Sequence, residues 1–320
     1  MRQNNQNVLI NLIKRNGYRA ITTIDKDEFE RYHGIISDIQ GNKFFVKAVS
    51  GESSYRYKSL FAECEVSSYL SSLTESDLLL YNGYRLKIPK VEKIIKEGEI
   101  LILISDYIKG RRLLDESSQF QAEMLITVLE LVTKLSGHTR RFQIQPYLKD
   151  YSRNTLLVYL PLRLMKAVFL SPFAAFKIIM TVPKVLPLFQ LQIYDNGLVH
   201  ADINASNILI NKKTVYLTDW EEAGWGISAY NIISPLCVHW QDRIIRNRLL
   251  RSLHDEGLKK AIIPLLSYRT LTLLNQKVSR KNIKRMRDLK LLNFDPASDI
   301  RILPIGINGK FSAVKGDKKI

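Results

Sequence analysis

Acidic residues are missing from one long stretch of this 320-residue chain, because no aspartate or glutamate occurs between Tyr151 and Tyr194. Basic residues do occur there, namely Arg153, Arg163, Lys166, Lys177 and Lys184. The whole chain has 48 basic and 31 acidic residues, which gives a formal net charge of +17. Such an excess attracts polyanions such as nucleic acid, anionic lipid, phosphorylated glycans or nucleotides. No nucleic-acid motif accompanies the basic runs, so we expect no specific nucleic-acid partner.

Cysteine is scarce too, since Cys64 and Cys237 are the only two and lie far apart. This spacing excludes a disulfide framework and a cysteine metal site, and it fits a reducing compartment. The N-terminus has no long apolar core, so we expect no secretory signal. In the apolar segment 154–189 the longest charge-free run is 167–176, shorter than the roughly 20 residues that span a bilayer. We therefore expect a cytoplasmic protein, at most peripheral on the inner face of the membrane.

Strand patterns dominate the first hundred residues. Segments rich in β-branched and aromatic residues predict strands at 18–24, 33–39, 43–49, 87–95 and 99–108. Gly41-Asn42 is a plausible hairpin turn between the second and third strands. Apolar spacing predicts one helix in this part of the chain, at 59–73.

Helical patterns dominate the rest. We expect an amphipathic helix at 121–138, two short strands at 208–210 and 215–220, and helices from 229 to about 292. This order predicts an α+β fold with a small β-rich lobe, a larger helical lobe and a ligand site between them. We place the lobes at 1–108 and 109–305, followed by a basic tail at 306–320.

Three polar residues of the second lobe have the spacing that phosphoryl transfer needs. In HADINASN, Asp202 precedes Asn207 by five positions, and VYLTDW places Asp219 at the end of a strand. Phosphoryl transfer needs a carboxylate that orients the attacking hydroxyl and oxygen ligands for magnesium ions on the phosphates. Asp202 and Asp219 are both flanked by apolar residues, and a carboxylate at the edge of a core needs a compensating partner.

These two segments, HADINASNIL and LTDWEEAGWG, resemble the signatures of the aminoglycoside phosphotransferase and choline kinase group. That group belongs to the protein-kinase-like superfamily, so the resemblance implies a two-lobed kinase-like fold that uses ATP and Mg²⁺. It also implies that Asp202 is the catalytic base, that Asn207 and Asp219 bind magnesium, and that His200 supports the catalytic loop.

The same resemblance extends to the first lobe. FFVKAV is similar to the kinase strand whose lysine, here Lys47, reaches the α- and β-phosphates. Glu63 stands where the family pairs a glutamate with that lysine, and Glu65 is the alternative. LISDYIKG is similar to the family hinge, which implies that adenine meets the carbonyl of Asp106 and the N–H of Ile108.

The sequence departs from the family pattern in three places. Ala201 replaces the glycine that often precedes the catalytic aspartate. Asn231 stands where the family often has an aspartate, and we expect it to weaken a helix-anchoring contact. The segment HGIISDIQG, at 33–41, which we take as the phosphate loop, has only two glycines.

The residues indicate the phosphate donor more directly than the acceptor. The chain charge argues against a polycationic aminoglycoside, and an acidic lining for choline is not evident, although both stay open. We expect the acceptor to be a hydroxyl of a small molecule or of a cell-envelope glycan or lipid-linked compound, and an anionic or lipid-linked acceptor fits the charge better. The segment 154–189 either lines the acceptor site or contacts an anionic membrane surface. A non-catalytic kinase-like scaffold at a membrane is the alternative to an enzyme.

Overall fold

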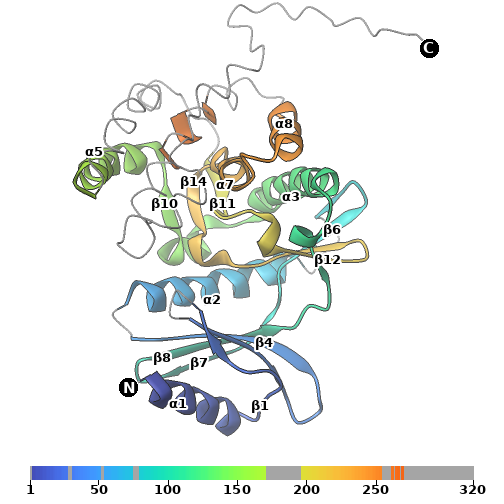
Figure 1. Cartoon of the computed structure of the whole chain (residues 1–320), viewed down its shortest axis with the longest axis vertical. Coiled ribbons are helices and arrows are strands. Elements are labelled where there is room, and N and C mark those ends of the chain that lie inside the picture. The colour runs from blue at the N-terminus through green and yellow to red at the C-terminus, as the bar shows by residue number, and fades with distance from the viewer. Residues whose placement is uncertain are drawn as a thin grey trace, which may run out of the picture.

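The computed structural model describes residues 2–27, 31–51, 54–74, 79–170, 196–253, 261, 262, 264–266, 268 and 269. The expectations for the basic tail, for helices beyond 269 and for residues 171–189 lie outside these residues. The described chain is an α+β structure with a sheet-rich N-terminal lobe and a largely helical C-terminal lobe (Figure 1). This architecture confirms the fold class that the order of strand and helix patterns predicts.

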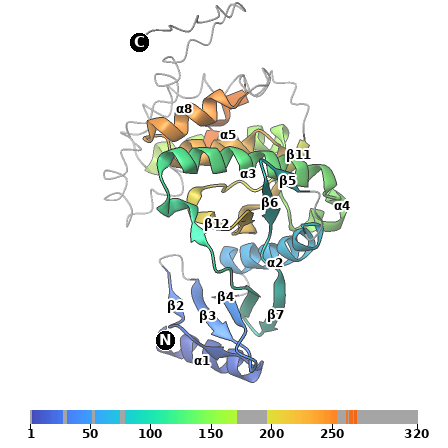
Figure 2. The ribbon, with the colours of Figure 1, turned by 90° about the vertical axis from the view of Figure 1, so that its right-hand side faces the viewer.

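One antiparallel sheet forms the N-terminal lobe, with strand order β1-β3-β4-β8-β7 and β2 paired to β3. Helix α1 follows one side of this sheet, and helix α2 lies between the sheet and the C-terminal lobe (Figure 2). The bounds are α1 Arg2–Arg15, β1 Arg19–Ala20, β2 Asp25–Lys26, β3 Tyr32–Ser37, β4 Lys43–Ser50, α2 Tyr55–Leu73, β7 Val91–Glu97 and β8 Ile100–Asp106.

Strand β8 shows why both helices are needed. Its side chains alternate in direction, as in any strand. Ile102 and Ile104 join the cluster that contains Leu12 of α1, whereas Leu101 and Leu103 join the cluster that contains residues of α2. The strand is therefore buried on both faces, which explains why its sequence is an almost continuous apolar run.

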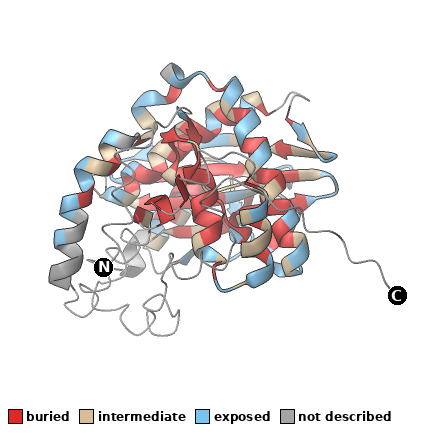
Figure 3. Cartoon of the chain, turned by 90° about the horizontal axis from the view of Figure 1, so that it is seen from above, coloured by how far each residue is buried: buried red, intermediate tan, exposed pale blue. Residues whose placement is uncertain are grey.

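The C-terminal lobe surrounds a single large core (Figure 3). Its sheets have the strand orders β5-β6-β13-β12-β9 and β10-β14-β11. The strand bounds are β5 Leu80–Tyr81, β6 Tyr84–Lys87, β9 Arg111–Arg112, β10 Lys149–Tyr151, β11 Asn196–Val199, β12 Ile208–Asn211, β13 Thr214–Leu217 and β14 Gly224–Ile227. The helix bounds are α3 Ser118–His138, α4 Arg141–Ile144, α5 Arg153–Leu170, α7 Tyr230–Val238 and α8 Arg243–Arg251.

The packing of β14 requires the two glycines of the segment LTDWEEAGWG. A Cβ atom on Gly224 would lie 2.3 Å from Cδ2 of Tyr151, and one on Gly226 would lie 2.2 Å from the Tyr151 carbonyl carbon. Gly226 also has a φ of +155°. Strand β14 can pair with β10 and β11 this closely only because these positions carry no side chain.

One local expectation was wrong and one helix was missed. The segment 33–41 is not the phosphate loop, because Asp38–Asn42 forms the turn at the end of the β3–β4 hairpin. The cavity is lined instead by Arg31, just before this segment, and by His33 at its start. Helix α1 was not predicted, because its N-terminal half is polar and carries little apolar periodicity.

Candidate active site

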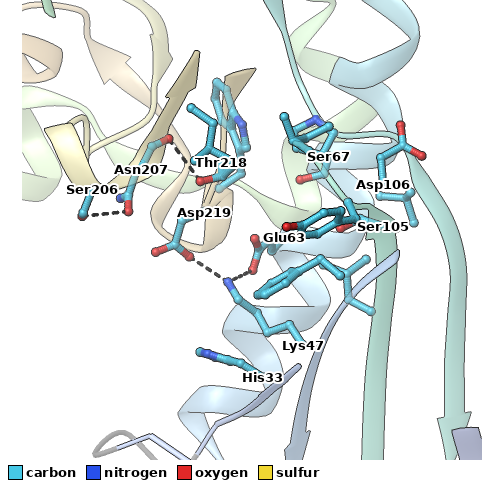
Figure 4. A pocket seen from close by; sticks show the side chains of 18 of the residues that line it. His33, Lys47, Glu63, Ser67, Ser105, Asp106, Ser206, Asn207, Thr218 and Asp219 are labelled. Carbon is cyan, nitrogen blue, oxygen red and sulfur yellow. Dashed lines mark hydrogen bonds and ion pairs between the residues drawn. The ribbon is translucent and has the colours of Figure 1, made fainter. Parts of the chain in front are cut away.

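The ammonium group of Lys47 joins the two lobes (Figure 4). Its Nζ lies 2.6 Å from Oε2 of Glu63 on α2 and 2.8 Å from Oδ1 of Asp219, which follows β13. Lys47 is only 7% exposed. Burial alone would lower the pKa of Lys47, but the carboxylates of Glu63 and Asp219 outweigh burial and raise it. The lysine therefore stays charged inside the protein.

The structure distinguishes the two glutamates that the sequence left open. Glu63 is buried and accepts a hydrogen bond from Lys47, whereas Glu65 is only partly buried and makes no such contact. Two residues along a helix turn the side chain by about 200°, so only one of the pair can face β4.

The loop at 200–207 brings Asp202 and Asn207 together. Nδ2 of Asn207 donates to the Asp202 backbone oxygen and to Oδ2 of its carboxylate, each at 3.0 Å. Oγ of Ser234, on α7, donates to the other carboxylate oxygen at 3.3 Å. Burial raises the pKa of Asp202 to about 6. A carboxylate with this pKa is ionised at neutral pH and is a stronger base than an ordinary aspartate.

The backbone of the site is strained at two positions, one in the loop at 200–207 and one directly after β13. Ala201 has a φ of 62° and Asp219 a φ of 67°, both in the left-handed region. Non-glycine residues pay roughly 1 kcal/mol or more for this conformation. The family glycine at position 201 is thus explained, and alanine is the smallest side chain that can replace it.

His200 anchors this backbone. Its Nε2 lies 3.0 Å from the Thr218 carbonyl, its Nδ1 accepts from the Asp202 amide at 3.3 Å, and its ring packs against Trp220. Burial lowers the pKa of His200 to about 4, so the ring is neutral. It therefore bridges the two motif segments and is poorly placed to act as the base.

Asn231 does not weaken the anchor, contrary to the expectation from sequence. Its Oδ1 accepts from the His200 amide at 2.8 Å and its Nδ2 donates to the Leu198 carbonyl at 2.9 Å. A carboxamide satisfies one donor and one acceptor of the backbone, which an ionised aspartate cannot do.

The cavity between the lobes has a volume of about 530 Å³. It is lined by Lys47, Glu63, Asn207 and Asp219 and by the hinge residues 106–108. A cavity of this size suits a nucleotide-sized ligand. All the residues that the sequence predicts to bind nucleotide or metal thus line this one cavity. Asp202 is not in the lining but contacts Asn207, which is.

Two charged residues in or beside this cavity escaped the sequence analysis. Arg31 pairs with Asp27 and with Glu221, and Glu221 is buried near Asp219. Glu63, Asp219 and Glu221 offer carboxylate oxygens that all lie within 4.8 Å of one another. Glu221 stands two residues after Asp219 in the same motif, which is a signal that could have been used. Nothing in the sequence around Arg31 indicates its position.

The donor set fits magnesium. Mg²⁺ prefers oxygen ligands from carboxylates and amides, and Asp219, Asn207 and Glu221 provide these. The Oε2 atom of Glu221 is buried and has no hydrogen-bond partner among the described residues, so it is available to a cation. Asn207 and Asp219 would hold the ion, with Glu221 beside them.

No family model matches the sequence, and no curated protein does. Solved structures do match. One is a thermostable mutant of aminoglycoside phosphotransferase APH(4)-Ia with ADP and hygromycin B, with a TM-score of 0.65 and 15% identity over 91% of this chain and 96% of that one. Macrolide 2'-phosphotransferase MphH from Brachybacterium faecium matches with a TM-score of 0.57 and 13% identity over 90% of this chain and 99% of that one.

A third match is a microcompartment-associated aminopropanol kinase, with a TM-score of 0.59 and 14% identity over 88% of this chain and 90% of that one. At such low identities the likeness establishes the fold. The chain has the protein-kinase-like fold of small-molecule phosphotransferases, as the two motifs of the C-terminal lobe predict.

The contact between Lys47 and Glu63 can be tested by comparing a substitution of Glu63 with the same substitution of Glu65. We expect Glu63→Gln to lower kcat/KM for Mg-ATP by about tenfold or more, because it removes one partner of a buried ion pair. Glu65→Gln, the matched control on the same helix, should stay within about twofold of the unmodified protein. Steady-state ATP consumption measures both. Equal losses in the two variants would contradict the assignment.

The pKa of Asp202 makes a prediction about stability. The folded-state pKa of about 6 lies above the ordinary 3.8, so the folded state resists ionisation of this carboxyl. The penalty is absent below about pH 4, grows as the pH rises to 6 and is complete above that. Asp202→Asn should therefore raise Tm at pH 8, and the gain should shrink at pH 5.

Asp150→Asn is the control, for which we expect a change in Tm of the opposite sign. Hydrogen bonds from Thr155 and Ser152 outweigh slight burial and lower the pKa of Asp150, so its carboxylate stabilises the folded state above the ordinary pKa. This variant should lower Tm at pH 8. A decrease in Tm at pH 8 for Asp202→Asn would refute the burial argument.

Proposed function

We propose that this protein is an ATP-dependent phosphotransferase that moves the γ-phosphate to a hydroxyl group. The observation that supports this most directly is the convergence of Lys47, Glu63, Asn207 and Asp219 on one cavity, with Asp202 beside it. Phosphoryl transfer depends on positioning and charge rather than on covalent chemistry, and these residues supply both.

Each residue has a distinct task in this proposal. The hinge at Asp106 and Ile108 binds adenine through its backbone, and Lys47, held by Glu63, contacts the α- and β-phosphates. Asn207 and Asp219 hold Mg²⁺, which when bound neutralises charge on the phosphates. Lys47 must then exchange part of its contact with Asp219 for the nucleotide, which its second partner Glu63 allows it to do without losing its position.

Asp202 orients the acceptor and takes its proton. Its two carboxylate oxygens already accept hydrogen bonds from Asn207 and Ser234, which fix the plane of the group. The acceptor hydroxyl donates to this carboxylate, so that its oxygen points in line with the γ-phosphate. The raised pKa lets Asp202 accept the proton as the new O–P bond forms and the bond between the γ-phosphorus and ADP breaks.

For the acceptor we propose a hydroxyl of an anionic glycan or of a lipid-linked glycan. The structural neighbours act on aminoglycosides, macrolides and aminopropanol, which shows that the fold accepts many small hydroxyl compounds. The charge of +17 and the acid-free stretch 151–194 favour an anion here over choline or an aminoglycoside. A scaffold without activity is the alternative, and the complete set of charged site residues weighs against it.

Helix α5 supports a peripheral contact with an anionic membrane. Val158, Leu162 and Met165 recur at helical spacing and are 68%, 59% and 57% exposed. They belong to the acid-free part of the sequence, whose basic residues complement anionic headgroups. No helix among the described residues has the length and apolarity to cross a bilayer. We propose that this exposed face of α5 rests on the lipid surface.

Transfer of labelled γ-phosphate from Mg-ATP into a cell extract tests the enzymatic proposal. The extract is then separated into lipid, glycan, protein and small-molecule fractions. We expect label in the glycan or lipid fraction, and a loss of at least about a hundredfold in Asp202→Ala, because a positioned base contributes about 10²–10⁴. Nucleotide binding should persist in that variant. Undiminished transfer by Asp202→Ala would exclude the proposed mechanism.

Sedimentation with vesicles tests the membrane contact. We expect binding to vesicles that contain phosphatidylglycerol, and weaker binding as salt increases, because headgroup attraction is screened. The double variant Val158→Ser and Leu162→Ser should lose most of this binding. Ile39→Ser, which changes a 93% exposed isoleucine at the β3–β4 turn, is the control and should bind normally. Equal binding by both variants would rule out α5 as the contact.

A further inference from the structure

The guanidinium group of Arg269 lies on the side of the site that we assign to the acceptor. Arg269 follows α8, in a helical stretch whose described neighbours Leu265, Leu266 and Tyr268 are buried. The Nε atom of Arg269 is buried and has no hydrogen-bond partner among the described residues. The residue as a whole is partly buried rather than fully buried.

The surroundings place this group next to the catalytic loop. Tyr230, Ser234 and Cys237 occupy positions i, i+4 and i+7 of α7 and so lie on one face of that helix. Ser234 of this face donates to Oδ1 of Asp202. Tyr230 and Cys237 of the same face interact electrostatically with Arg269, as Asp202 itself does. Arg269 therefore lies close enough to Asp202 for the two charges to interact, on the side of Asp202 where α7 packs.

This side of the site differs from the nucleotide side. The carboxylates around Lys47 are Glu63 and Asp219, and neither is among the principal charges that act on Arg269. Asp202 stands between the two regions, since Asn207 binds one of its oxygens and Ser234 the other. A ligand at Arg269 thus approaches Asp202 from the side of α7.

No acidic group among the described residues neutralises Arg269 by direct pairing. Burial raises the pKa of Cys237 to about 12 and that of Tyr151 well above its usual value, so both are neutral. Both oxygens of Asp202 already accept hydrogen bonds. The carboxylate of Glu222 pairs with Lys149, at 2.5 Å, and accepts from Tyr55.

A partly desolvated cation without a partner is costly, and an oxyanion removes that cost when it binds. The arginine fork suits phosphate and carboxylate in particular, because it donates two parallel hydrogen bonds. We propose that Arg269 binds an anionic group, a phosphate or carboxylate, carried by the acceptor beside the hydroxyl that Asp202 orients. This inference rests on the proposed function and narrows its acceptor to hydroxyl compounds that carry a negative charge close to the reacting group.

Calorimetric titration with inorganic phosphate tests this site directly. The nucleotide site is first saturated with Mg-AMP-PNP, which fills the position of the γ-phosphate. We expect one phosphate to bind per chain, and its Kd to rise at least about tenfold in Arg269→Ala, as for loss of a charged hydrogen-bonding partner. Arg269→Lys should bind with intermediate affinity, and Arg251→Ala, which removes an exposed arginine of α8, should bind normally. Unchanged binding in Arg269→Ala would refute the proposal.

A second titration separates the two possible sources of the anion. If Arg269 instead contacts the phosphoryl group in transfer, phosphate will bind with Mg-ADP and will be excluded by Mg-AMP-PNP. That result would overturn an acceptor role. An acceptor role requires binding of similar strength in both nucleotide states, with the same loss in Arg269→Ala.

Thermal stability distinguishes binding from a structural role. An arginine without a hydrogen-bond partner for its buried Nε should cost stability, so Arg269→Leu should keep or raise Tm without ligand. Added phosphate should raise the Tm of the unmodified protein but not of this variant. A large decrease in Tm would show that Arg269 serves the fold. If no nucleotide binds at all, the phosphotransferase proposal fails, while phosphate titration of the protein alone still decides the role of Arg269.

Discussion

The contact of Lys47 with Glu63 and Asp219 is the constraint on which the site depends, because it joins three elements from two lobes through one buried charge. Strand β4 supplies the lysine, α2 supplies one carboxylate, and the segment after β13 supplies the other. A buried ammonium is tolerated only while anionic groups stay close to it. The arrangement therefore fixes the position of α2 between the sheet and the C-terminal lobe, and with it the shape of the cavity.

Behind this contact, a second network holds a backbone that is locally unfavourable. Ala201 and Asp219 both adopt left-handed conformations. His200 and Asn231 bind the backbone around them with four hydrogen bonds. The buried neutral imidazole and the carboxamide thus preorganise a loop whose function, in our proposal, is to aim Asp202. Such strain persists only when the surrounding structure determines it from several sides.

The acceptor side follows a different electrostatic logic. On the nucleotide side, carboxylates surround a lysine and leave oxygen atoms for a cation. On the side that we propose for the acceptor, no carboxylate among the described residues pairs directly with Arg269, and the sequence between 151 and 194 contains no aspartate or glutamate. In our proposal one site thus presents opposite charges to its two ligands, with Asp202 between them. The same proposal accounts for a strongly basic chain on a fold that it shares with an aminoglycoside phosphotransferase.

The sequence by itself determined the fold class and the local identity of the loop residues. Strand and helix periodicity depends on neighbours a few positions apart, and the spacing of Asp202, Asn207 and Asp219 is set by one loop and one hairpin. Tertiary structure alone decided which distant groups meet. Glu63 rather than Glu65 contacts Lys47, and Arg31 rather than the turn at 38–42 lines the cavity. Arg269 lies near Asp202 although 67 positions separate them in the sequence. Contacts between residues far apart in the chain depend on packing, which a single sequence does not encode in any local pattern.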